Sequence, residues 1–127
     1  MIPPRQFLID FDGTLALQDY PFIEKEVPHA IRVVKRMQDA GHILILLTMR
    51  HGDELDHAKA WLKDNGLHFN DFNRNTMFET GSRKVYGHYH IDDHNIGCPI
   101  IHDHTLHHKP FVDWLVVEQI LEEKELI

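Results

Sequence analysis

Two short apolar runs that each end in polar, chemically reactive side chains constrain the fold more than any other feature of this sequence. Residues 6–11 read QFLIDF and lead into an Asp-Gly pair, and residues 43–48 read ILILLT. Each run has the length of a strand and is apolar on both sides of an extended chain, which is typical of a strand buried in a parallel sheet. The sequence therefore predicts an α/β fold.

Helical and extended segments alternate along the rest of the chain. After Pro28, which suits the first turn of a helix, apolar residues recur at helical spacing as far as Gly41. A second helix is expected between a cap at Asp53 and the Asn65-Gly66 pair. We further expect strands at 67–73, 86–91 and around 100–101, a return segment with a short helix at 74–84, and a last helix at 111–123. This order predicts one domain over residues 1–127, with a parallel sheet and helices on both faces.

The composition restricts where such a domain works and what it binds. The 127 residues suffice for one hydrophobic core, and the longest aliphatic run, residues 43–47, is far shorter than the roughly 20 residues of a membrane span. A single cysteine and no signal-like leader make the cytoplasm the expected location. The formal charge of −7 makes nucleic acid an unfavourable partner, although a local basic patch stays possible.

Acidic residues stand at the ends of two predicted strands. Asp10 lies near the end of the first apolar run and Asp12 directly follows it, and Asp92 and Asp93 follow the strand at 86–91. If these strands are neighbours, about 4.8 Å apart, three or four carboxylates converge. Two like charges 4 Å apart repel by about 4 kcal/mol at an effective dielectric of 20, and a cation would relieve this repulsion. Oxygen ligands alone favour Mg²⁺, which usually bridges carboxylates to a substrate phosphate.

Such a site has the groups that phosphoryl transfer needs. A carboxylate beside the metal can attack phosphorus to form an aspartyl-phosphate, and a second carboxyl two residues further on can act first as acid and then as base. Thr48, at the tip of another strand, offers a hydroxyl to a phosphate oxygen. Arg50, Arg74 or Lys84 would balance the remaining charge.

Three segments in this order resemble motifs of the haloacid dehalogenase (HAD) superfamily. FLIDFDGTLA at 7–16, ILILLTMR at 43–50 and YHIDD at 89–93 are similar to the first, second and fourth motifs. The resemblance implies a Rossmann-like core and a Mg²⁺-dependent phosphohydrolase. An aspartate at position 12 is typical of the phosphatases of the superfamily.

The resemblance also implies a role for each matching residue. Asp10 would be the nucleophile, and Asp12 the general acid and base, with its backbone carbonyl also on the metal. Thr48 would hold the phosphate. Either Asp92 or Asp93 would complete the metal site, and Asp93 is the favoured direct ligand.

The third motif, a Lys or Arg that binds the phosphate, is where this sequence departs from the family pattern. Lys84 lies at the start of the strand at 86–91, which is roughly 20–26 Å from its carboxyl end at about 3.3 Å per residue. Arg74 follows the preceding strand directly, so we prefer Arg74 and keep Lys84 as the alternative. Further contacts with substrate are expected from Gly13, Thr14, Arg50 and His51.

The segments between the motifs leave no room for the cap domain that most members of this superfamily carry. An open site excludes water poorly and selects weakly among small molecules. We therefore expect either a large phosphorylated substrate, such as a polymer end, or a second copy of the chain that closes the site over a phosphorylated small molecule. The loop at 16–26, with Tyr20 and Phe22, is a candidate lid.

Two other functions stay open from the residues alone. The first is a catalytically idle module that binds a phosphorylated ligand or protein. The second is a transition-metal binder that uses the dense group of histidines between His102 and His108. We interpret these histidines more simply as loop residues near the rim of the site.

Overall fold

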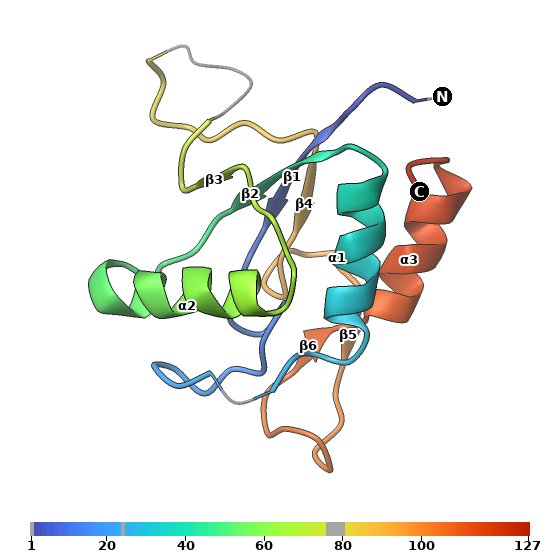
Figure 1. The fold of residues 1–127 in the computed structure, drawn as a ribbon. Coiled ribbons are helices and arrows are strands. Elements are labelled where there is room, and N and C mark those ends of the chain that lie inside the picture. The colour runs from blue at the N-terminus through green and yellow to red at the C-terminus, as the bar shows by residue number, and fades with distance from the viewer. Residues whose placement is uncertain (1, 24, 76–80) are drawn as a thin grey trace.

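The computed structural model describes residues 2–23, 25–75 and 81–127. Its centre is a parallel sheet of four strands in the order β3-β2-β1-β4, and a separate antiparallel pair joins β5 to β6 (Figure 1). The strands are β1 (Gln6–Ile9), β2 (Ile43–Leu46), β3 (Asp71–Phe72), β4 (Tyr89–Ile91), β5 (Ile100–Ile101) and β6 (Phe111–Val112), and the helices are α1 (Ala30–Asp39), α2 (Gly52–Asp64) and α3 (Trp114–Glu123).

The register of the sheet aligns the carboxyl ends of its three longest strands. Ile9, the last residue of β1, pairs with Leu46 at the end of β2 and with Ile91 at the end of β4. Because these strands are parallel, the polar segments that follow them begin side by side at one edge of the sheet. The predicted α/β class is confirmed, with a Rossmann-like core.

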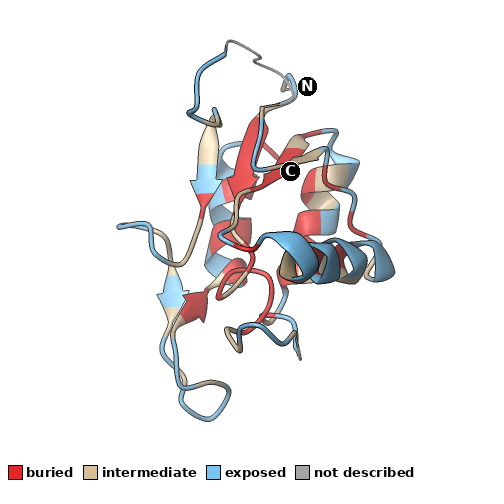
Figure 2. Cartoon of the chain, turned by 90° about the vertical axis from the view of Figure 1, so that its left-hand side faces the viewer, coloured by how far each residue is buried: buried red, intermediate tan, exposed pale blue. Residues whose placement is uncertain are grey.

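The buried apolar residues of all three helices join a single cluster on one face of the sheet. Phe7 and Ile9 of β1 and Leu44 and Leu46 of β2 belong to that cluster, whereas Leu8 is buried outside it. Neighbouring residues of a strand point to opposite faces, so Leu8 marks the second face. Figure 2 shows the buried residues concentrated in the central strands and the helix surfaces turned toward them.

The sequence predicts helices on both faces of the sheet. At Leu8, the structure covers the second face with chain that is not helical. The backbone of Gly87 packs directly on Leu8, because a Cβ at that glycine would lie 2.6 Å from the Leu8 Cγ atom. The described parts of the return segment, residues 74–75 and 81–88, form no helix. The expected short helix at 74–84 falls partly on residues 76–80, which lie outside the described residues. In the described part, irregular chain at Gly87 therefore covers Leu8 on this face.

Several predicted boundaries shift by a few residues. Phe111 and Val112 form β6 and do not belong to the last helix, which starts at Trp114 because the Asp113 side chain accepts a hydrogen bond from the Val116 amide at 3.3 Å. Helix α2 begins at Gly52, so Asp53 lies in its first turn and is not its cap. The strands expected at 67–73 and 86–91 shorten to β3 and β4. In the described part of the chain, no helix is long and apolar enough to span a membrane.

Candidate active site

Hydrogen bonds between strands bring the predicted carboxylates together at the carboxyl edge of the sheet. The Asp10 amide donates to the Ile91 carbonyl at 3.0 Å, which holds the residue after β1 beside the end of β4. Asp10, Asp92 and Asp93 each offer a carboxylate oxygen, and these oxygens all lie within 4.8 Å of one another. The predicted convergence is therefore confirmed for three of the four carboxylates.

Gly13 and Thr14 hold the Asp93 carboxylate against the loop that follows β1. Gly13 has a φ of +79°, and a Cβ there would lie 2.5 Å from the Asp93 Oδ2 atom, so only glycine fits. The Thr14 hydroxyl lies 3.3 Å from both Asp10 Oδ2 and Asp93 Oδ1. It also accepts a hydrogen bond from the Asp93 amide at 3.2 Å. Thr14 therefore connects the two acidic segments.

The electrostatic state of this acidic group favours a bound cation. Burial, followed by the negative charge of Asp92, raises the pKa of Asp10 from 3.8 to about 8. Burial also raises the pKa of the Asp93 carboxyl. Three close carboxylate oxygens are the hard donors that Mg²⁺ prefers, so the residues present fit this ion. A divalent cation would offset the repulsion that now favours the protonated form.

The Asp12 carboxylate lies outside the acidic group and is paired with Arg50. Both oxygens accept hydrogen bonds from the guanidinium, from Nε and Nη2, each at 2.8 Å. The Arg50 side chain is only 1% exposed, and its Nη1 donates to the carbonyls of Pro21 and Glu54 at 3.1 and 3.3 Å. The ring of Tyr20 stacks 5.0 Å from the guanidinium carbon. Arg50 thus positions Asp12 through both of its carboxylate oxygens.

An open cavity of about 770 Å³ lies over these strand ends. Of the predicted residues, Asp10, Asp12, Thr48, Arg50 and Asp92 line it. Thr48 is fixed by its backbone, since its amide donates to the Asn73 side chain at 2.8 Å. Two lining residues, His94 and Lys109, lie outside every motif and outside the candidate lid loop that the sequence indicates.

Other predicted substrate contacts lie away from this cavity. Thr14 is fully buried, and Gly13 is buried beneath Asp93. Both residues hold the loop against Asp93, and neither lines the cavity. His51 is exposed at the start of α2 and does not line the cavity. These corrections share one cause, which is that proximity in sequence to a motif does not decide which way a side chain points.

The two cations expected to bind the phosphate are also absent from the lining. Arg74 lies 3.1 Å from the Asp71 carboxylate through Nε and lines a different, smaller cavity. Lys84 is exposed on the return segment, where its carbonyl accepts a hydrogen bond from the Asn75 side chain at 3.0 Å. The structure therefore places neither residue in the lining of this cavity.

Among the residues that the structure describes, Asp10, Asp92 and Asp93 form the one group arranged to hold a metal ion. The histidines between His102 and His108 do not form such a group, and the His107 and His108 rings instead stack with centroids 4.4 Å apart. The transition-metal alternative therefore lacks a preformed site.

Comparison with known proteins identifies one family relationship. No protein-family model and no curated protein matches the chain. A solved structure of a conserved protein coded by a locus from Bacteroides thetaiotaomicron aligns with a TM-score of 0.79 and 31% sequence identity. The alignment covers 96% of this chain and 93% of that one. The chain therefore belongs to the same family as this conserved Bacteroides protein.

Proposed function

We propose that this protein is a HAD-type phosphatase, a Mg²⁺-dependent hydrolase of phosphomonoesters that works through an aspartyl-phosphate. The observation that carries the proposal is the acidic group of Asp10, Asp92 and Asp93 beneath a cavity that Asp12 and Thr48 also line. Two carboxylates at the end of one strand, with distinct surroundings, suit the separate roles of nucleophile and acid–base.

In the proposed reaction, an oxygen of the Asp10 carboxylate attacks phosphorus and the bond to the leaving oxygen breaks. Asp12 in its carboxylic acid form donates its proton to that leaving oxygen. The Asp12 carboxylate then takes a proton from a water molecule, which attacks the phosphorus of the aspartyl-phosphate and releases inorganic phosphate and the Asp10 carboxylate. The Thr48 hydroxyl, at the rim of the cavity, would bind a phosphate oxygen.

Asp10, Asp92 and Asp93 would hold Mg²⁺, with the Asp12 carbonyl as a further ligand. The ion would neutralise the charge on the carboxylates and phosphate. Of the two candidates next to β4, Asp93 is the better anchored, because Thr14 and Gly13 fix its carboxylate. This supports the role of direct ligand that the sequence favours for Asp93.

The open cavity suits a phosphorylated small molecule or the phosphorylated end of a polymer. Exposed side chains of Tyr20, Phe22 and Met49 lie on the segments that follow β1 and β2. A second copy of the chain could cover this surface, and the reducing cytoplasm suits a chain with one free cysteine.

The decisive test is hydrolysis of p-nitrophenyl phosphate with Mg²⁺. Wild-type protein should release p-nitrophenol, EDTA should stop the reaction and Mg²⁺ should restore it. Asp10→Asn should lower kcat by about 10³-fold or more, because it removes the nucleophile. Asp64→Asn, an exposed change of the same kind on α2, should leave the rate unchanged. Full activity of Asp10→Asn would eliminate the proposed mechanism.

One observation favours a second function, a catalytically idle module that binds a phosphorylated ligand. Arg50 engages both oxygens of Asp12, which fixes the carboxylate in one orientation and leaves only the remaining lone pairs of these oxygens for a leaving group. If wild-type protein binds inorganic phosphate in the presence of Mg²⁺ but turns over no phosphate ester, this second function is correct. Turnover that depends on Asp12 rules it out.

A further inference from the structure

The cavity over the acidic group contains few positive charges to receive a phosphate. In the described part of the chain, its basic lining residues are Arg50, His94 and Lys109. Arg50 is already engaged by Asp12 and by two backbone carbonyls. His94 Nε2 lies 3.5 Å from Asp93 Oδ2. Lys109 is thus the lining cation for which no ion pair is found among the described residues.

Lys109 is held at this cavity by the segment that follows it. The Val112 amide of β6 donates to the Gly13 carbonyl at 3.0 Å, and the Trp114 indole donates to the Thr14 carbonyl at 2.7 Å. Phe111, between these anchors and Lys109, is buried. The chain after Lys109 is therefore hydrogen-bonded to the loop that contains the predicted nucleophile and acid. More than ninety residues separate these two segments in sequence.

The negative charge of the cavity favours such a cation. Asp10 and Asp92 line it, and Asp93 adjoins them, so even with a divalent ion bound this end of the cavity keeps negative charge. A phosphate monoester entering there carries a further negative charge, and an ammonium group at the rim offsets it through a charge-assisted hydrogen bond. Neither Arg74 nor Lys84 lines this cavity.

We propose that Lys109 binds the phosphoryl group of the substrate and supplies the positive charge that the sequence assigned to Arg74 or Lys84. This inference rests on the proposed phosphatase function. It assigns the phosphate-binding cation to the segment between β5 and β6, on the carboxyl-terminal side of the Asp92-Asp93 pair.

The test compares Lys109→Ala with variants at the two rival positions, Arg74→Ala and Lys84→Ala. Lys63→Ala, an exposed lysine near the end of α2, controls for the change in net charge. Two quantities are measured with Mg²⁺ present: kcat/KM for p-nitrophenyl phosphate, and the Kd of inorganic phosphate by isothermal titration calorimetry.

Lys109→Ala should lower kcat/KM and weaken phosphate binding by about 10- to 100-fold each, the range for loss of a charge-assisted hydrogen bond. Lys109→Arg should recover most of both losses, because it restores the positive charge. Lys63→Ala should stay within about twofold of wild type. Lys109→Ala values within that same range overturn the proposal, as does an equal loss on Lys84→Ala or Arg74→Ala.

Failure of this inference and failure of the proposed function give different results. Turnover that depends on Asp10 but not on Lys109 overturns the Lys109 assignment alone. Absence of turnover in wild-type protein, with phosphate binding that Lys109→Ala weakens, overturns the phosphatase function and supports Lys109 as the anion-binding residue. Absence of both turnover and phosphate binding overturns both.

Discussion

At the scale of single residues, the candidate site depends on a position that has no side chain. The Asp93 carboxylate occupies the volume that a Cβ of Gly13 would need, so the distance between the two acidic segments is set by a glycine. Thr14 then joins Asp10 to Asp93 through one hydroxyl. Small changes in this loop should therefore act on the candidate metal site more strongly than on the fold.

Gly13→Ala should lower the free energy of unfolding by about 1–2 kcal/mol through its positive φ, and should weaken Mg²⁺ binding at least tenfold by displacing Asp93. Gly41→Ala is the matched control, because Gly41 also has a positive φ, of +87°, but has open space around its Cβ position. Urea denaturation and Mg²⁺ titration measure the two effects. Equal Mg²⁺ affinity in the two variants would contradict the role given to the Gly13–Asp93 contact.

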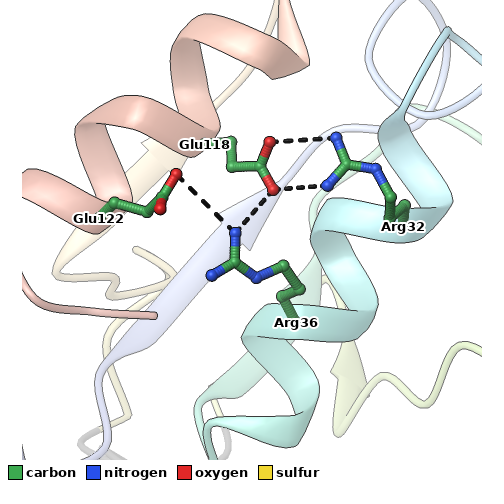
Figure 3. Close-up of polar contacts among 4 residues, drawn as sticks. All are labelled: Arg32, Arg36, Glu118 and Glu122. Carbon is green, nitrogen blue, oxygen red and sulfur yellow. Dashed lines mark hydrogen bonds and ion pairs between the residues drawn. The ribbon is translucent and has the colours of Figure 1, made fainter.

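At the scale of elements, a charged contact joins the first and last helices. Arg32 and Arg36 of α1 both reach Glu118 of α3, with nitrogen–oxygen distances of 2.5 and 2.7 Å (Figure 3). Hydrogen bonding from Arg32, with further help from Arg36, lowers the pKa of Glu118 to about 2. Glu122 lies farther away, 3.8 Å from Arg36. This contact connects α1 and α3, which are more than seventy residues apart in sequence.

Glu118→Gln should lower the free energy of unfolding by about 1 kcal/mol, a modest value because both arginines are half exposed. The pKa of Glu118 is lowered on folding, so its contribution is present above about pH 4.5 and is lost as the pH falls toward 2. Denaturant titrations at pH 6 and pH 3 should show the difference from wild type shrinking at the lower pH. Glu122→Gln should have little effect at either pH, and a larger loss there than in Glu118→Gln would refute this assignment.

At the scale of the whole molecule, we expect the acidic group to make stability depend on pH and on divalent cations. The folded protein retains the Asp10 proton up to about pH 8, whereas in the unfolded chain the carboxyl ionises near its ordinary pKa of 3.8. The contribution of Asp10 to stability is therefore present below about pH 4 and is lost as the pH rises toward 8. A cation that binds the ionised group reverses this loss.

Without metal, the difference in melting temperature between Asp10→Asn and wild type should grow in favour of the variant from pH 5 to pH 8. Added Mg²⁺ should raise the melting temperature of wild type, more at pH 8 than at pH 5, with a much smaller rise in Asp10→Asn. Differential scanning calorimetry in EDTA and in Mg²⁺ measures both effects. Parallel pH profiles for the two proteins, with no response to Mg²⁺ in either, would show that these carboxylates do not form a cation site.

The sequence by itself was sufficient for the class of the fold and for the acidic group. Apolar runs that end in Asp10, Thr48 or Asp92 predict buried parallel strands, and parallel strands necessarily present their carboxyl ends at one edge. That reasoning needs only local patterns and the geometry of a sheet. It also predicted the three helices α1, α2 and α3 that the structure describes, because apolar periodicity is a local property.

Only the tertiary structure decided which charges face the cavity. Arg50 turns inward to Asp12, Arg74 pairs with Asp71, and Lys109 lines the site because β6 is hydrogen-bonded to Gly13. The same is true of the described part of the return segment, which forms no helix on the second face of the sheet. The physical reason is that side-chain direction and long-range hydrogen bonds depend on partners distant in sequence, which no local pattern encodes.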